Sequence, residues 1–371
     1  MTGIARETIG QRFSSGHAST GFDYLRIGLS CAICLWHAWW ALTGQLAWHT
    51  ELWSGWLNFI PKSFVPLFFA LSGFLVAGSL ERNKLHHFIT LRALRIIPAL
   101  AFEIVISACI IGVIFTSLPL DAYLTSPEFR SYFLNVMGII QYTLPGVFPH
   151  NPLPELMNPQ LWTIPYELEC YLAISVLAVL GLVWQGYRLG VVVAGMMALG
   201  TAYALYVALR LPDGLFTEHA GNISGRVLVV VFLAGVLLYR HRDRLPYSHA
   251  LGVLSLLAMM VALRFPAFYY LSVLPVAYVA AWIGVMRPPA IPFGDLSYGV
   301  FLFHFPMTQV VVALGGAALG TWWLFGPVAL VASALCAAVS WKLVEEPLLT
   351  KKRAIIGWVD GTWTKLRPAR S

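Results

Sequence analysis

Charged residues are scarce in this chain of 371 residues. Asp, Glu, Lys and Arg make up 11% of it, whereas hydrophobic residues make up 58% and the mean hydropathy is +0.73. A soluble globular domain typically holds about 25% charged residues. The composition therefore excludes a water-soluble protein and predicts an integral membrane protein.

The sequence also lacks internal repeats, low-complexity tracts and Gly/Ser linkers. The first apolar run has no small-residue cleavage site of the signal-peptide kind, which favours a retained helix. The tail after the last apolar run is too short to hold a second domain. We therefore expect a single membrane domain over residues 1–371, with short cytoplasmic tails at 1–21 and 347–371.

Cysteine is sparse as well. All five cysteines lie in apolar runs, where a thiol behaves as a small hydrophobic group. Cys31 and Cys34 form a C-x-x-C, but the soluble βαβ context of a redox motif is missing. We expect no metal site and no permanently bound cofactor.

Long apolar runs are what the chain has in abundance, and runs of about 17 to 25 such residues indicate bilayer spans. Ten such runs are present, at 22–43, 63–80, 91–118, 161–183, 189–209, 226–239, 249–264, 267–286, 297–314 and 321–345. The loops between them differ in charge. Seventeen Lys and Arg residues lie in the two tails and alternate loops, against five in the remaining loops. Because basic residues favour the cytoplasm, both termini are predicted to be cytoplasmic. Topology thus explains the net charge of +7, and we expect no nucleic-acid partner.

Arg26 and His37 stand eleven residues apart in the first apolar run. At 100° per residue they share one helix face, about 16 Å apart along the axis. Asp23 lies near the same stripe, and we expect it to pair with Arg26 at i, i+3. Arg within a membrane helix costs at least about 2.5 kcal/mol, so such a stripe normally faces the bundle interior or a watery cavity. The sequence therefore predicts an all-α polytopic membrane protein, with about ten transmembrane helices around a polar central cavity.

A second pair of arginines, Arg92 and Arg95, opens the third run at i, i+3, with Thr90 as the expected helix cap. A helix amino terminus concentrates unpaired N–H groups and positive dipole, so two added guanidinium groups favour phosphate binding. The alternative is a topology anchor that contacts lipid headgroups.

Two later segments carry ionisable groups into or beside the membrane. Glu167, near the start of the fourth run, shares a helix face with Tyr171, whereas Glu169 points about 200° away. His304 precedes the kink-prone Pro306 in the ninth run, and a lone histidine there is more often structural than catalytic. After the last run, the adjacent acidic residues 345 and 346 predict a cytoplasmic ion-pair latch.

The longest predicted external segment, residues 119–160, is rich in Pro, Asn and aromatic residues. Turn-forming residues at that density favour a shaped loop over another span. The segment is expected to be an outer lid or acceptor platform. The alternative is a rigid connector.

Taken in order, these segments resemble the integral-membrane acyltransferase-3 family. The resemblance covers nearly the whole membrane region. The matching stretches are Phe22–Arg26 with His37, Leu67–Leu75, Arg92–Pro98, Leu161–Leu172, Leu296–Pro306 and Val344–Pro347. The resemblance implies transfer of an acyl group, most often acetyl, from cytoplasmic acyl-CoA to a carbohydrate of the bacterial cell envelope. It also implies that Arg26 and His37 are essential and that Arg92 and Arg95 belong to the acyl-CoA site.

The chain departs from the family pattern at two acidic positions. Many members carry an acidic residue where this chain has Pro66, and the second acidic residue expected after Glu167 is Leu168. Some relatives also append an extracytoplasmic hydrolase-like domain. Because this sequence has none, the membrane domain is expected to complete the transfer to the acceptor by itself.

The resulting hypothesis gives His37 the role of general base on an acceptor hydroxyl, or of first acyl carrier. Glu167 orients the acceptor or the imidazole. Acetyl-CoA is the expected co-substrate, and the bacterial inner membrane the expected location. Further substrate-binding candidates are His304 and three possible oxyanion donors, Tyr142, Asn158 and Trp162. Aromatic residues of the 119–160 segment are expected to stack on sugar rings, namely Tyr132, Phe133, Tyr142 and Phe148.

Two other functional classes share the polar helices and the number of spans. A transporter would use the stripe on the first helix to line a substrate path, and a scaffold would hold a polysaccharide-export complex together. Transporters often have pseudo-symmetric halves with broken helices at matching positions. No such internal match is present, which favours acyl transfer. The sequence does not define the oligomeric state.

Overall fold

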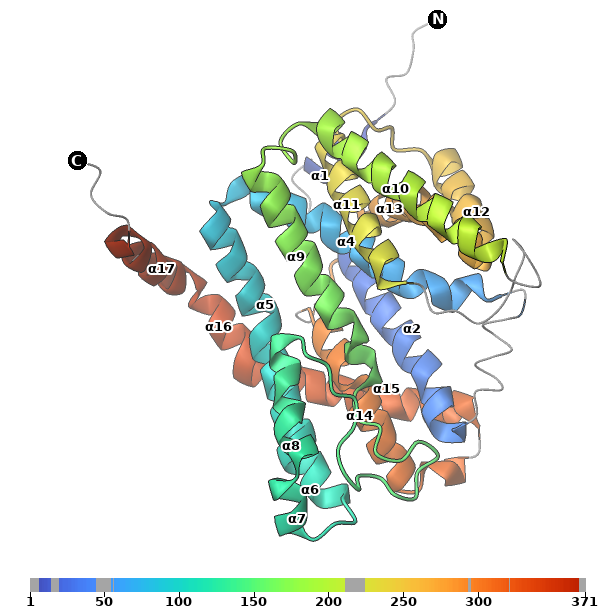
Figure 1. Cartoon of the computed structure of the whole chain (residues 1–371), viewed down its shortest axis with the longest axis vertical. Coiled ribbons are helices and arrows are strands. Elements are labelled where there is room, and N and C mark those ends of the chain that lie inside the picture. Colours follow the sequence, from blue (N-terminus) through green and yellow to red (C-terminus); the bar gives the residue numbers. More distant parts are fainter. Residues whose placement is uncertain are drawn as a thin grey trace, which may run out of the picture. The chain divides into compact units, whose positions relative to one another are not determined.

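The computed structural model describes residues 7–14, 20–44, 55, 57–210, 224–292, 295–319 and 321–366. Within these ranges the chain is helical and has no strand, only three isolated β-bridges (Figure 1). Ten helices occupy the ten predicted spans. They are α2 (Gly21–Thr43), α4 (Phe59–Arg82), α5 (Leu85–Ile106), α9 (Ile164–Val179), α10 (Gly186–Ala208), α11 (Gly225–Arg240), α12 (His249–Arg264), α13 (Val273–Gly284), α14 (Ser297–Ala313) and α15 (Trp322–Ser340).

Six helical stretches among the described residues are long and apolar enough to cross a membrane. They are Gly21–Thr43, Phe59–Arg82, Leu85–Phe115, Gly186–Ala208, Pro266–Gly284 and Trp323–Thr350. Helices α12 and α14 are also apolar but shorter. The protein is therefore an all-α polytopic membrane protein, as predicted.

Short elements connect and flank these helices. They are α1 (Ile9–Ser14), the π-helical η1 (Ser107–Ile111), α6 (Gly112–Phe115), α7 (Leu120–Thr125), α8 (Pro127–Tyr132), η2 (Phe133–Met137), η3 (Pro159–Thr163), η5 (Pro266–Ser272), η6 (Gly316–Leu319), the π-helical η7 (Trp341–Glu345), α16 (Glu346–Thr350) and α17 (Lys352–Leu366). The 119–160 segment thus contains two short helices and a 3-10 turn before its irregular part.

The chain forms two compact units, each built from two separate stretches. The first unit comprises Met1–Gly78 and Trp162–Asp295, and the second comprises Ser79–Leu161 and Leu296–Ser371. Because each unit combines distant parts of the sequence, no single linker separates them. The expectation of one membrane domain over the chain stays a prediction.

Within the first unit, α4 and α11 approach each other through glycine. A Cβ on Gly73 would lie 2.0 Å from the carbonyl oxygen of Phe232, and one on Gly235 would lie 2.2 Å from that of Ala70. Small residues allow such close approach of helix backbones in membrane proteins. An aromatic cluster packs beside this crossing, with the rings of Phe22 and Phe74 stacked at 5.3 Å.

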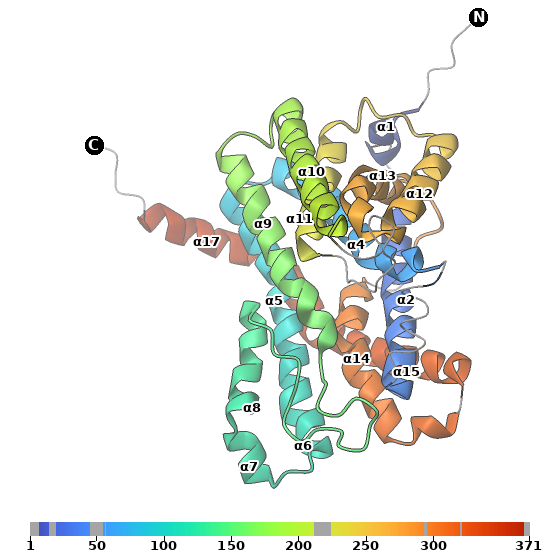
Figure 2. The ribbon, with the colours of Figure 1, turned by 45° about the vertical axis from the view of Figure 1, so that its right-hand side comes forward.

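Within the second unit, α14 and α15 cross closely, since a Cβ on Gly299 would lie 2.8 Å from the Cβ of Ala337. Helix α5 continues through η1 into α6, and α8 lies alongside α5 and α6 in both views of the ribbon (Figures 1 and 2). The hydroxyl of Tyr123 donates to the carbonyl of Ala108 in the π-helical turn at 2.8 Å. A Cβ on Gly112 would lie 1.9 Å from that hydroxyl, so only glycine fits there.

Candidate active site

Helix α2 carries the predicted pair Arg26 and His37. The guanidinium of Arg26 forms an ion pair with Asp295, and the two side chains are 23% and 22% exposed. The expected partner, Asp23, interacts electrostatically with both groups, but the hydrogen bond of Arg26 goes to Asp295. The prediction of an Arg26–Asp23 pair was therefore wrong, because a residue 269 positions away lies closer to the guanidinium.

Asp295 was missed in the sequence analysis. It directly precedes Leu296-Ser297-Tyr298, the start of the ninth apolar run. An acidic residue at the edge of an apolar run is a signal that would have found it. Its pairing with Arg26 joins the start of α2 to the segment that leads into α14.

His37 lies on α2 three turns beyond Arg26 and is half-buried. Its ring centroid lies 5.9 Å from that of Trp40. The helix is continuous from Gly21 to Thr43, so the shared face expected for Arg26 and His37 is kept.

The first unit also holds Trp162 and Glu167. The carboxylate of Glu167 accepts a hydrogen bond from the hydroxyl of Tyr171 at 2.7 Å, as their shared helix face predicts. Glu169 is exposed, which agrees with its opposite direction on α9. The Trp162 ring packs edge-on against Tyr166 with centroids 6.0 Å apart.

Arg92 and Arg95 lie inside α5, not at its amino terminus. The helix begins at Leu85, and Thr90 donates its hydroxyl to the carbonyl of His86 within the helix at 2.9 Å. The expected cap at Thr90 was wrong because residues 85–90 contain no helix breaker, so the helix starts more than a turn earlier. The helix-terminus argument for phosphate binding is lost with it.

The two arginines have different surroundings in the second unit. Arg95 lies 3.7 Å from the carboxylate of Glu345, and its guanidinium lies over the ring of Tyr298 at 5.7 Å. Arg92 lies over the ring of Phe88 at 6.0 Å. Its Nε is buried and makes no hydrogen bond to a described residue. The expected carboxylate latch therefore joins α5 to η7 through Arg95 and Glu345.

His304 is fully buried in α14, and its Nδ1 lies 2.7 Å from the carbonyl oxygen of Phe301. A carbonyl only accepts, so this ring nitrogen carries the proton. The hydroxyl of Thr308 in turn donates to the carbonyl of His304 at 2.5 Å. These contacts fit the structural alternative for this histidine, and its role in substrate binding stays a prediction.

The 119–160 segment is organised around buried polar side chains. Asn151 donates to Gln309 of α14 at 3.1 Å, and Gln309 donates to the carbonyl of Leu156 at 2.8 Å. Tyr142 is 40% exposed, whereas Tyr132 and Phe148 are buried. Stacking on a sugar therefore remains open for Tyr142, but the expectation was wrong for Tyr132 and Phe148, whose rings fill the core of the segment.

Asn158 lies in a buried hydrogen-bond network. Its side-chain nitrogen donates to Glu103 at 2.9 Å and also to the hydroxyl of Tyr132, and its oxygen accepts from Gln160 at 2.9 Å. Both N–H groups are thus engaged, which leaves none for an oxyanion. Burial raises the pKa of Tyr132 well above its ordinary value, and Glu103 raises it further, so this phenol stays protonated.

Glu103 was also missed in the sequence analysis. It is a single carboxylate in the middle of the third apolar run, at a depth where an ionisable side chain is expensive and usually functional. The cost of placing a carboxylate in this apolar run was the signal in the sequence that would have found it. It lies eleven residues after Arg92, the spacing that separates His37 from Arg26.

Two side chains at the start of α5 contact the carboxy-terminal helix. The Nε2 atoms of His86 and His87 each lie 2.8 Å from the same oxygen of Asp360 on α17. These hydrogen bonds lower the pKa of the Asp360 carboxyl. The three groups tie α17 to α5 within the second unit.

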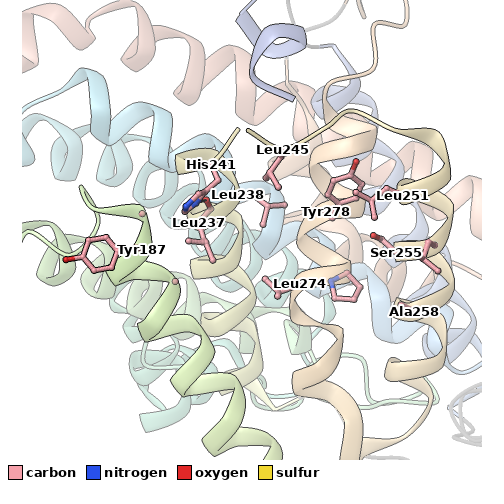
Figure 3. A pocket seen from close by; sticks show the side chains of 14 residues that line it. Tyr187, Leu237, Leu238, His241, Leu245, Leu251, Ser255, Ala258, Leu274 and Tyr278 are labelled. Carbon is pink, nitrogen blue, oxygen red and sulfur yellow. Dashed lines mark hydrogen bonds between the residues drawn. The ribbon is translucent and has the colours of Figure 1, made fainter. Parts of the chain in front are cut away.

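A cavity of about 550 Å³ lies within the first unit, among α10, α11, α12 and α13 (Figure 3). Its lining is almost entirely apolar; Tyr187, Leu237 and Leu274 are typical members. None of the predicted site residues lines it. It is not the predicted polar cavity, which stays a prediction.

Comparison with known proteins agrees with the motifs. The family model for the acyltransferase domain matches residues 19–341. Nodulation protein 10 of Rhizobium leguminosarum bv. viciae is 28% identical over 384 residues, covering 92% of this chain and 96% of that protein. No solved structure matches the chain. The family match spans most of the sequence and includes Arg26, His37, Arg92 and Arg95, so the chain belongs to the acyltransferase-3 family of membrane acyltransferases.

Proposed function

We propose that this acyltransferase moves an acetyl group from cytoplasmic acetyl-CoA to a hydroxyl group of a carbohydrate of the bacterial cell envelope. The observation that carries the proposal is the arrangement on α2. Arg26 is fixed by Asp295, and His37 lies on the same face of the same helix. An arginine and an imidazole held on one membrane helix supply positive charge and a base, which acyl transfer needs.

His37 acts on the acceptor in this proposal. Its neutral imidazole takes the proton of the acceptor hydroxyl as the oxygen attacks the thioester carbon. The bond between that carbon and sulfur breaks, and the leaving CoA thiolate receives the proton. An acyl-imidazole at His37, formed first and then passed to the hydroxyl, gives the same products. Glu167 positions the acceptor or the imidazole, and its hydrogen bond to Tyr171 fixes its direction.

The donor is proposed to bind through Arg92 and Arg95. Two guanidinium groups on one face of α5, close to its cytoplasmic end, are suited to the phosphates of CoA. Arg95 lies 3.7 Å from the carboxylate of Glu345, so a phosphate would compete with that carboxylate. Positive charge concentrated on the side that holds both termini supports a cytoplasmic donor and a bacterial inner-membrane location.

One assay tests the proposal directly. The purified protein is supplied with acetyl-CoA, and release of free thiol is followed with and without a panel of envelope glycans. Glycan-dependent thiol release, with acetyl recovered as an ester on the glycan, is the expected result. Thiol release that no glycan accelerates would contradict a carbohydrate acceptor, and an absence of release would contradict acetyl-CoA as donor. Longer acyl-CoA donors in parallel define the acyl length.

A further inference from the structure

Glu103 has one satisfied and one unsatisfied oxygen. Its side chain is completely buried in α5, inside the Leu85–Phe115 span. Oε1 accepts hydrogen bonds from the hydroxyl of Ser107 and from the amide of Asn158. Oε2 is buried and receives no hydrogen bond from any described residue. Buried polar atoms are nearly always paired, so this one requires an explanation.

The surroundings of Glu103 are rigidly held. Gln160 donates to Asn158 at 2.9 Å and to the carbonyl of Leu302 in α14 at 2.7 Å. The side chain of Asn135 donates to the backbone carbonyl of Tyr132 at 2.8 Å, which holds the backbone at Tyr132 in place. The N–H groups of Asn158 and Gln160 and the hydroxyl of Ser107 are therefore already engaged and cannot turn toward Oε2 without breaking a hydrogen bond. The hydroxyl of Tyr132 is the remaining donor of the network, and a group from outside can take its place at Oε2.

A hydroxyl group fits this position better than other ligand groups. As a carboxylate, Glu103 needs a donor at Oε2, whereas as a carboxylic acid it needs an acceptor there. A hydroxyl is both donor and acceptor and satisfies either state. An amide N–H, a carbonyl or a cation satisfies only one.

The residues around Glu103 point to the acceptor side of the reaction. Tyr132, Asn158 and Gln160 all belong to the 119–160 segment, which the charge distribution places opposite the cytoplasmic arginines. Arg92 lies on the same helix face as Glu103, about 16 Å away along α5. We propose that Oε2 of Glu103 binds a hydroxyl group of the acyl acceptor, a site that rests on the proposed function.

Access to this site requires movement of the irregular part of the 119–160 segment. Residues 138–158 contain no helix or strand and are tied to α14 through Asn151 and Gln309. Loops that cover a site commonly open and close during turnover. The π-helical turn directly after Glu103 is also a feature found frequently at functional sites.

The test replaces Glu103 with glutamine. Glu103→Gln keeps an oxygen for Ser107 and Asn158 but turns Oε2 into an NH₂ group of the same size, so the network can persist. In the thiol-release assay we expect the KM for the glycan to rise about tenfold, the loss expected when a buried hydrogen bond is altered, while the KM for acetyl-CoA changes less than about twofold. Ser333→Ala is the matched control. It removes another buried hydrogen bond of the second unit, from Ser333 to the carbonyl of Ala329, and should change neither KM.

An unchanged glycan KM in Glu103→Gln, together with equal use of all the deoxy analogues described next, overturns the acceptor site. If this variant aggregates, the wild-type protein is tested instead. Its substrates are methyl glycosides of the accepted terminal sugar, each lacking a different hydroxyl group. One deoxy analogue should lose about tenfold in kcat/KM, and equal use of all analogues overturns the site. If the wild type releases no thiol with any glycan, both the proposed function and the Glu103 site are wrong. If the wild type is active, a negative result at Glu103 contradicts the site alone.

Discussion

Helices α2 and α5 share one spacing of ionisable groups but place these groups in different surroundings. Each carries an arginine followed eleven residues later by a second ionisable group on the same face, Arg26 with His37 and Arg92 with Glu103. In the first unit, the arginine is ion-paired and the distal imidazole is half-buried. In the second unit, the Nε of Arg92 is buried and makes no hydrogen bond to a described residue, and the distal carboxylate is completely buried. A shared pattern in sequence thus leads to a paired arginine with a half-buried imidazole in one helix and to a completely buried carboxylate in the other.

The largest effect on the comparison between α2 and α5 is expected at His37. His37→Ala should reduce acetyl transfer at least about 100-fold, because general base catalysis contributes that much or more. Thiol release and glycan acetylation measure it. His249→Ala is the matched control, since that ring packs against Tyr247 and Trp282 in the first unit and lies outside the proposed site. Near-normal acetylation by His37→Ala removes this residue from the chemistry.

The ion pair on α2 should come next in effect. Arg26→Ala and Asp295→Ala should each lower stability by about 1 to 3 kcal/mol, because each leaves a charge without its partner in a partly buried place. A double-mutant cycle should give a coupling energy of about 0.5 to 3 kcal/mol. Thermal unfolding in detergent measures both, with Glu169→Gln, an exposed carboxylate of the same unit, as the control. Additive effects of Arg26 and Asp295 would show that the pair is not coupled.

Variants of the two arginines and of Glu345 test the proposed donor site on α5. Arg92→Ala and Arg95→Ala should weaken CoA binding, and that binding should also weaken as salt rises. Glu345→Gln should leave CoA binding unchanged or tighten it, because it removes the carboxylate that competes for Arg95. Calorimetric titration with CoA checks all three variants. Unchanged affinity in both arginine variants, together with poor membrane insertion, identifies them as topology anchors.

The 119–160 segment should govern the acceptor and not the donor. Exchanging it with the segment of a relative that modifies another glycan should move acceptor preference while CoA affinity stays constant. Tyr142→Ala should raise the glycan KM several-fold, since this ring is exposed, whereas Phe148 is buried and serves the fold. Competition between two glycans measures the preference. A swapped protein that keeps its original acceptor at full rate makes the segment a connector.

The smallest effect is expected at α17. Hydrogen bonds to His86 and His87 lower the pKa of the half-buried Asp360. Their contribution to stability is therefore present above the ordinary Asp value near 3.9 and is lost as pH falls through the lowered value. Asp360→Asn should therefore increase proteolysis of α17 at neutral pH, and the difference from wild type should vanish in strong acid. Hydrogen exchange of residues 352–361 checks this. Equal protection at neutral pH would show that the contact does not hold the helix.

The sequence alone located the helices and the family. Apolar runs are local features, so each of the ten predicted ranges overlaps a helix, and the direction of Glu167 toward Tyr171 follows from helix periodicity alone. Periodicity also placed Arg26 and His37 on one face.

Only the tertiary structure decided which side chains meet. Asp295 reaches Arg26 across 269 positions, and Asn158 reaches Glu103 across 55. Local rules favoured Asp23 as the partner and Thr90 as a cap, and both expectations failed. An ion pair forms with the carboxylate that packing brings nearest. A helix starts where its backbone groups first form hydrogen bonds. Both depend on contacts that no short stretch of sequence contains.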